Sequence, residues 1–146
     1  MSRVTATAES TVAAPPEAVL AALADYRETR PAILTEHYTD YAVTEGGTGA
    51  GTVATWHLHA TKKRVRHVVA DVETTADTVV EKDRNSTLVT TFRVTPAAGG
   101  SAVVATTTWE GATGIGGFFE RTFAPAGLKR IHGELLANLD TRLRSA

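Results

Sequence analysis

Histidines at alternating positions are the residues of this sequence best placed to do chemistry. His57 and His59 stand two apart in a stretch rich in strand-forming residues, and His67 lies in the next such stretch. Alternate side chains of a strand share a face, so the first two can lie together with His67 on a neighbouring strand. Such an arrangement can hold zinc or copper, or can transfer protons near neutral pH. Because the spacing fixes no third ligand, we interpret these histidines as surface residues and predict no metal site.

Four other residues could contribute a charge to a binding site. Glu36 and His37 are adjacent just before a predicted strand, and Glu110 stands where the last strand meets the C-terminal region, so each could lie near the mouth of a cavity. Arg66 could pair with a ligand carboxylate if it points inward. The run Lys63–His67 also has the alternating charges of a solvated edge strand. No combination of these residues identifies a catalytic set, and nothing in the sequence indicates a cofactor.

The composition restricts the class of protein. The chain has 146 residues, enough for one domain over 1–146, and 15 Lys and Arg against 16 Asp and Glu give a net charge of −1. That charge is unlike a nucleic-acid-binding module. The sequence contains no cysteine, which excludes disulfides and thiolate chemistry. No stretch reaches the roughly 18 apolar residues of a membrane span, and a signal peptide's apolar core is missing, so we expect a cytoplasmic protein.

Segments rich in β-branched residues predict an antiparallel sheet of six or seven strands. The expected strands cover 4–12, 38–45, 52–60, 64–73, 78–83, 87–95 and 101–109, with turn residues between them at intervals typical of hairpins. Two short helices are expected after the first strand. One covers 16–25, where Pro16 and Glu17 suit a first helical turn, and the other covers 29–35.

The C-terminal part of the sequence predicts a long helix over 117–143. Its apolar residues fall on one stripe, formed by Leu128, Ile131, Leu135 and Leu139. Pro125 should kink this helix or begin it afresh. Gly114–Gly117 precedes it and lacks the Lys-Ser/Thr ending of a phosphate-binding loop, so we interpret it as a hinge. One helix cannot fill the concave side of so wide a sheet, which predicts a cavity between sheet and helix.

Strand alternation predicts which side chains face this cavity. The more apolar face of 53–60 carries Trp56 and Leu58, which places His57 and His59 on the outer face. A slip of one residue would invert this assignment. The predicted ligand-binding residues are Trp56, Leu58, Arg66, Val68, Phe92, Trp109, Phe119, Phe123, Ile131 and Leu135. Each of them could instead simply pack the core.

Three stretches carry a resemblance to a known family. They are Val12–Val19 with Leu23–Tyr26, Gly49–Val53, and Thr106–Gly111 leading into 114–123. Together they resemble the START and birch-pollen-allergen (SRPBCC) superfamily, and within it the bacterial polyketide cyclase/dehydrase and lipid-transport group. The resemblance implies an α+β helix-grip fold, in which a curved antiparallel sheet wraps around a long C-terminal helix. It also implies a hydrophobic or aromatic ligand, but it transfers no catalytic residue.

Three functional hypotheses remain open because this fold serves many functions. The first is a carrier that binds a lipid-like or polyketide-like molecule. The second is a polyketide cyclase or dehydratase that uses the same cavity, which would need a titratable side chain inside it. The third is a subunit that docks on a protein partner, which a large exposed apolar patch would favour. The sequence leaves open whether the chain is a monomer or a homodimer.

Overall fold

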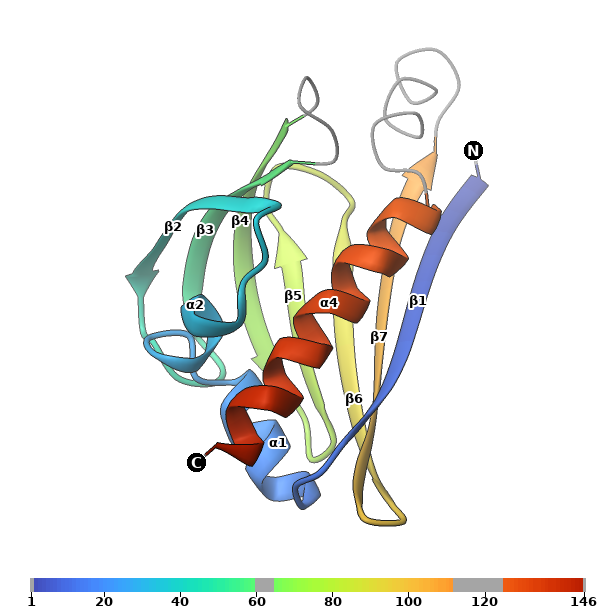
Figure 1. The fold of residues 1–146 in the computed structure, drawn as a ribbon. Coiled ribbons are helices and arrows are strands. Elements are labelled where there is room, and N and C mark those ends of the chain that lie inside the picture. Colours follow the sequence, from blue (N-terminus) through green and yellow to red (C-terminus); the bar gives the residue numbers. More distant parts are fainter. Residues whose placement is uncertain (1, 60–64, 112–124, 146) are drawn as a thin grey trace.

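The computed structural model describes residues 2–59, 65–111 and 125–145, and within them the strands form one antiparallel sheet of seven strands in the order β1-β7-β6-β5-β4-β3-β2. The strands are β1 (Ser2–Val12), β2 (Tyr38–Glu45), β3 (Val53–His59), β4 (Val65–Thr74), β5 (Thr78–Asp83), β6 (Val89–Ala97) and β7 (Gly100–Gly111). The helices within the described residues are α1 (Pro16–Leu23), α2 (Thr29–Ile33) and α4 (Pro125–Arg144). Figure 1 shows α4 crossing one face of the sheet, with α1 near its C-terminal end.

The predicted helix-grip fold is confirmed, with differences of a few residues at the element ends. The strands at 38–45 and 78–83 have the predicted bounds. The described part of α4 runs from Pro125 to Arg144, so the predicted kink or fresh start at Pro125 falls at the border of the described residues and stays a prediction. The segment 117–124 of the predicted helix lies outside the described residues.

Burial alternates along the strands as the apolar pattern predicted. On β3, Trp56 and Leu58 are buried while His57 and His59 are only partly so, and the same alternation holds on β4, β6 and β7. The predicted stripe of α4 is buried, together with His132 and Leu136. The core therefore lies between the sheet and the inner side of α4.

The turn between β2 and β3 holds the link between α1 and α2 in place. The N–H of Tyr26 donates to the carbonyl of Gly47 at 2.9 Å, and the N–H of Gly49 donates to that of Ala24 at 2.9 Å. Gly49 has a φ of 70°, a conformation that glycine adopts at no steric cost. These bonds fix the short segment from which Tyr26 and Arg30 reach into the core.

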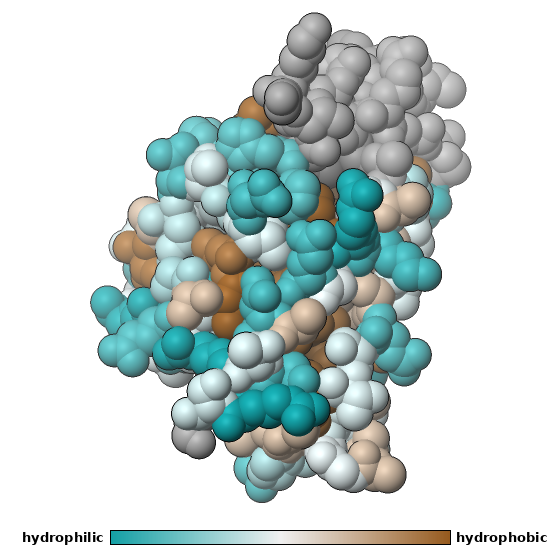
Figure 2. Space-filling model, in the orientation of Figure 1, coloured by the Kyte–Doolittle hydropathy of each residue, from teal (hydrophilic) through white to brown (hydrophobic). Residues whose placement is uncertain are grey.

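The surface is mainly polar. Figure 2 shows mostly hydrophilic and intermediate residues on the visible face, with smaller patches of hydrophobic residues near its centre and its left side. In the described ranges, Val65 is the exposed large hydrophobic residue, at 46%. None of the helices described here is both long and apolar enough to cross a membrane.

Candidate functional site

A buried ion pair joins α2 to the sheet. An Nη of Arg30 lies 2.7 Å from an Oε of Glu81 on β5, and only 5% and 7% of the two side chains are exposed. Arg30 also donates to the hydroxyl of Tyr26 at 2.8 Å and to the carbonyl of Leu23 at 3.1 Å. The Tyr26 hydroxyl in turn donates to Glu81 at 2.5 Å. A cation, a carboxylate and a phenol thus form one hydrogen-bonded cluster inside the protein.

Asp25 places Arg30 in this cluster. The Asp25 carboxylate accepts hydrogen bonds from the N–H groups of Arg27, Glu28 and Thr29 and from the Thr29 hydroxyl. Burial opposes the charge of this carboxylate, but the hydrogen bonds outweigh burial and lower its pKa. Local bonds of this kind favour turns and helix starts, so the sequence itself specifies the fold of this segment.

The cluster stays ionised at Arg30 and protonated at Tyr26. Burial alone would lower the pKa of Arg30, but the negative charge of Glu81 outweighs it and raises that pKa above its usual range. Burial raises the pKa of Tyr26 well above its ordinary value. Pairing is what makes such a buried charge tolerable, because an isolated one would be expensive.

A second polar group, His132, enters the core from α4. It is 5% exposed, and its Nε2 lies 2.6 Å from the Thr107 hydroxyl, which lies 2.7 Å from that of Thr90. Burial, with a smaller effect of the Arg30 charge, lowers its pKa to about 4. The imidazole is therefore neutral at pH 7, and one of its nitrogens carries a proton.

The ring of Phe92 lies between these two polar groups. The Arg30 guanidinium carbon is 5.0 Å from its centroid, and the His132 ring meets it edge to face at 6.3 Å. Among the described residues, Arg30 Nε and His132 Nδ1 are buried without a hydrogen-bond partner. Two unsatisfied nitrogens thus border one aromatic surface, an arrangement that suits a flat molecule carrying oxygen atoms.

A second group of aromatic side chains lies on β2 and β3. Tyr41 stacks on Trp56 with centroids 6.2 Å apart and planes at 11°, and Tyr38 meets Trp56 edge to face at 6.3 Å. The Tyr41 hydroxyl donates to the carbonyl of Tyr26 at 2.5 Å. Through Tyr41, this second aromatic group therefore contacts the segment of Tyr26 and Arg30, which carries the buried ion pair.

Most of the predicted ligand-binding residues lie on the inner side of the sheet or of α4. The buried members are Trp56, Leu58, Val68, Phe92, Trp109, Ile131 and Leu135. Arg66 is partly buried, 4.0 Å from Asp83, and burial lowers its pKa. Phe119 and Phe123 lie outside the described residues, as does the Gly114–Gly117 segment. That any of these residues contacts a ligand stays a prediction.

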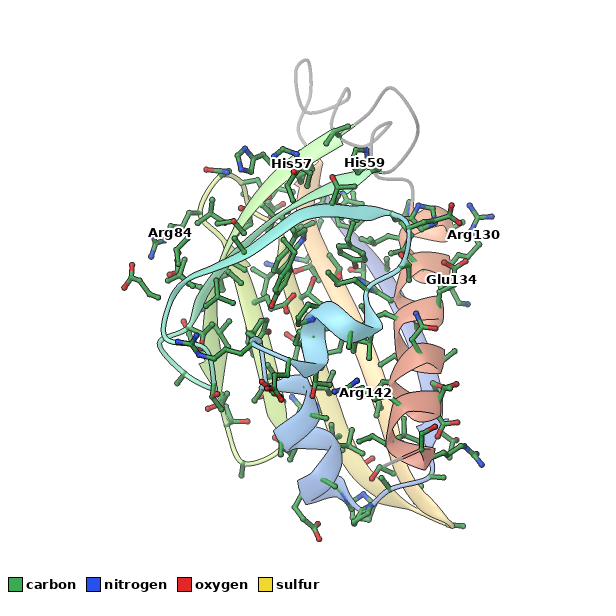
Figure 3. The ribbon with its side chains drawn as sticks, turned by 60° about the vertical axis from the view of Figure 1, so that its left-hand side comes forward. His57, His59, Arg84, Arg130, Glu134 and Arg142 are labelled. Atoms are coloured by element: carbon green, nitrogen blue, oxygen red, sulfur yellow. The ribbon has the colours of Figure 1, made fainter. Side chains whose placement is uncertain are left out.

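The histidine pair lies on the outer side of the sheet. His57 Nδ1 is 3.0 Å from an Asp40 oxygen, and the His57 and His67 rings are 4.4 Å apart. His59 Nε2 is 2.7 Å from the Thr39 hydroxyl. Figure 3 shows His57 and His59 together toward one end of their strand. In the described part of the chain, no three His, Cys, Asp or Glu side chains are grouped to hold a metal ion.

The other charged candidates make contacts near the protein surface. His37 lies 3.7 Å from Glu134 of α4, while Glu36 is exposed. Figure 3 shows Glu134 on the same helix as Arg130. Glu110 is 3.9 Å from Arg3 on the neighbouring strand. These contacts link surface elements, and none of them joins the buried cluster.

Sequence reasoning missed the buried cluster and His132. A usable signal existed for both. Glu81 alternates with the apolar Val79 on β5, and His132 stands between apolar positions on the predicted stripe of α4. A polar residue at such an inward position requires a buried partner.

The described residues also form a surface pocket of about 770 Å³ between α2 and the last turns of α4. Its lining exposes polar and apolar surface in similar amounts and consists of Thr29, Ala32, Asn138, Thr141, Arg142, Leu143 and Ser145. It lies beside the sheet–helix interface and is distinct from the predicted cavity within it. That inner cavity stays a prediction.

Comparison with solved structures supports the fold described above. The chain is 21% identical to the protein TTHA0849 from Thermus thermophilus, with a TM-score of 0.75 and coverage of 97% and 98% of the two chains. It is 10% identical to the major latex-like protein 151 of Panax ginseng, with a TM-score of 0.73 and coverage of 96% and 97%. These likenesses define the class of protein as a helix-grip fold.

The family follows from the sequence. Residues 3–144 match the family of polyketide cyclase/dehydrase and lipid transport proteins, and the chain therefore belongs to that family. It is also 54% identical to the KanY protein (ms6282), whose solution structure gives a TM-score of 0.91 with 99% of both chains covered. Curated protein sequences gave no significant match.

Proposed function

We propose that this protein binds a mainly apolar, flat small molecule between the sheet and α4, and that His132 and Arg30 hold its oxygen atoms. The observation that carries the proposal is the pair of buried, unpartnered nitrogens beside Phe92 in the described residues. Leaving a buried polar atom without a hydrogen bond costs about 1–3 kcal/mol, so a protein that keeps two such nitrogens gains from a ligand that satisfies them. The chain would act as one domain over 1–146 around this site.

The chemistry of His132 favours binding over proton transfer. A general base works best when its pKa is near the working pH, and burial holds the pKa of His132 at about 4. At pH 7 the neutral ring can instead donate or accept one hydrogen bond at Nδ1, depending on its tautomer. A carrier needs only that hydrogen bond, whereas a cyclase or dehydratase would need the imidazole of His132 to take up and release a proton.

A polyketide cyclase or dehydratase is the second candidate function. Two observations support it. One is the family, and the other is the row of hydrogen bonds that links His132 to Thr107 and Thr107 to Thr90, which could orient a substrate carbonyl. For this function, a bound substrate would have to raise the pKa of His132 toward 7. A partner-binding subunit has less support, since the described surface exposes few large apolar side chains.

The first experiment is native mass spectrometry of the purified protein, followed by organic extraction of any bound molecule. It is paired with titration of the tryptophan fluorescence by 1,8-dihydroxyanthraquinone and by anthracene. We expect the oxygenated probe to bind more tightly because its carbonyl and hydroxyl groups can accept from Arg30 Nε and can either accept from or donate to His132 Nδ1.

His132→Leu provides the decisive variant, with His59→Leu on the outer face as its matched control. His132→Leu should remove the preference for the oxygenated probe, and His59→Leu should keep it. Equal binding of both probes by the wild-type protein would contradict the proposal. Conversion of an oxygenated probe to a product that depends on His132 would favour the enzyme.

A further inference from the structure

The outer edge of β1 is unusually regular for an exposed sheet edge. β1 has 11 residues, and each of them pairs with β7 without a register shift. Its other side pairs with no strand among the described residues, and Figure 1 shows β1 as the outermost strand there. β1 contains no proline, lysine or bulge, three of the devices that protect such an edge, although it carries the charged Arg3 and Glu9.

The opposite edge of the sheet carries such protection. β2 has register shifts between Thr39 and Ala42 and between Val43 and Glu45, and Asp40 has a φ of 56°. Irregularities of this kind bend a strand and interrupt further pairing. β1 is therefore the edge suited to accept another strand.

The exposed side chains of β1 complement themselves when the strand is paired antiparallel with its own copy. Arg3, Thr5, Thr7 and Glu9 are exposed on one face, and Ala6 lies at their centre. A register centred on Ala6 places Arg3 opposite Glu9 of the second copy and Thr5 opposite Thr7 of the second copy. Opposite charges and Thr–Thr pairs both stabilise antiparallel strands.

Other arrangements lose this match. Centring the pair on Thr5 or on Thr7 leaves Arg3 and Glu9 opposite uncharged positions. Parallel pairing in register sets Arg3 beside Arg3 and Glu9 beside Glu9, which is repulsive. The charges therefore select one register and one direction.

We propose that β1 is a dimerisation edge, at which a second copy of this chain adds its β1 antiparallel about a two-fold axis at Ala6. Such an interface is self-complementary, as closed dimers require. The net charge of −1 gives little repulsion between two copies. A single strand edge buries less surface than a standard interface, so the dimer should dissociate reversibly at a concentration on the order of micromolar.

The test begins with sedimentation velocity of the full chain over rising concentration. The wild type should shift from monomer to dimer. Arg3→Glu and Glu9→Arg should each weaken the dimer about tenfold or more, because each puts like charges opposite one another at two symmetric places. Lys129→Glu and Glu36→Arg make the same charge changes at exposed positions outside β1 and should leave the dimer unchanged.

Mixing the two β1 variants provides the sharper arm. Combining Arg3→Glu with Glu9→Arg restores opposite charges at both places, so a heterodimer should form although neither variant pairs well with itself. Native mass spectrometry with one variant isotopically labelled would measure the fraction of heterodimer. Arg3 also lies 3.9 Å from Glu110 within its own chain, and loss of that contact would not be repaired by the second variant. Heterodimer formation in the mixture therefore distinguishes pairing of β1 between two copies from destabilisation of β1 within one copy.

Two outcomes would overturn the proposal. One is a wild-type protein that stays monomeric at several hundred micromolar. The other is a mixture in which the two variants, both folded by circular dichroism, form no more heterodimer than homodimer. Amide hydrogen exchange of the wild type gives an independent readout, since alternate β1 amides should gain protection as concentration rises.

Discussion

Glu81→Gln should be among the most destabilising single substitutions in this protein. It removes the negative partner of Arg30 where the two side chains are 5% and 7% exposed and 2.7 Å apart. Breaking a buried ion pair from one side leaves an uncompensated charge and costs about 3–5 kcal/mol. It also weakens the acceptor of the Tyr26 hydroxyl. Because domains of this kind are stable by only about 5–15 kcal/mol, the variant should lose a large part of its stability.

Urea unfolding followed by circular dichroism measures this loss. For a chain of this length about 2–4 °C of Tm accompanies each kcal/mol, so the melting temperature should also fall by about 6–20 °C. Lys82→Gln is the matched control on the same strand. It breaks an exposed pair with Glu73 at 3.0 Å and should change stability by less than about 1 kcal/mol.

A double-mutant cycle separates the contribution of the Arg30–Glu81 pair to the free energy of unfolding from the contributions of the surrounding contacts. Arg30→Met combined with Glu81→Leu removes both charges and should be far more stable than the sum of the single effects predicts, because no buried charge remains. A loss below about 1 kcal/mol for Glu81→Gln, equal to that of Lys82→Gln, would refute the reasoning. It would mean that water reaches Arg30 in the folded protein.

Three other predictions concern the inner side of α4 and its contact with α2. Leu135→Ala removes a buried side chain and should cost about 2–5 kcal/mol of unfolding free energy in urea; a loss under about 1 kcal/mol would show a loosely filled interface. The pKa of His132 is about 4 in the folded protein and near 6.5 in the unfolded chain, so the unfolded chain takes up the proton first as the pH falls. The free energy of unfolding should therefore fall by about 3 kcal/mol between about pH 6.5 and pH 4. His132→Leu should flatten that part of the stability–pH curve, and an unchanged slope would assign it to other groups. Asn138→Ala removes the 3.0 Å bond from its amide to the Ile33 carbonyl and should speed hydrogen exchange in α2 while costing about 1 kcal/mol; unchanged exchange would show that other contacts hold α2.

The sheet and α4 could be predicted from sequence because their signals are local. Alternation of apolar and polar residues placed Trp56 inside and His57 outside, and the structure agrees. The spacing of Leu128, Ile131 and Leu135 gave the buried stripe of α4. Some element ends differ from the prediction by a few residues because neighbouring residues fit strand and turn equally well.

The candidate site could not be predicted in the same way because its parts are distant in sequence. Tyr26 and Glu81 are 55 positions apart, and Thr107 and His132 are 25 apart. Nothing local distinguishes Arg30 from an exposed arginine until the fold brings α2 against β5. Alternation could have marked Glu81 as an inward carboxylate, but naming its partner requires the three-dimensional arrangement.

The polar groups of the core differ in a way that bears on function. Those that only support the fold are satisfied within the chain, as Tyr26 is by Glu81 and Thr107 by Thr90. Arg30 Nε and His132 Nδ1 are not satisfied by any described residue, although both terminal nitrogens of Arg30 have partners. An apolar residue in place of His132 would avoid the cost of burying an imidazole with one free nitrogen. A core that keeps both groups around one aromatic ring is better suited to recognising a molecule than to packing alone, and this difference is the physical basis for placing the ligand beside Phe92.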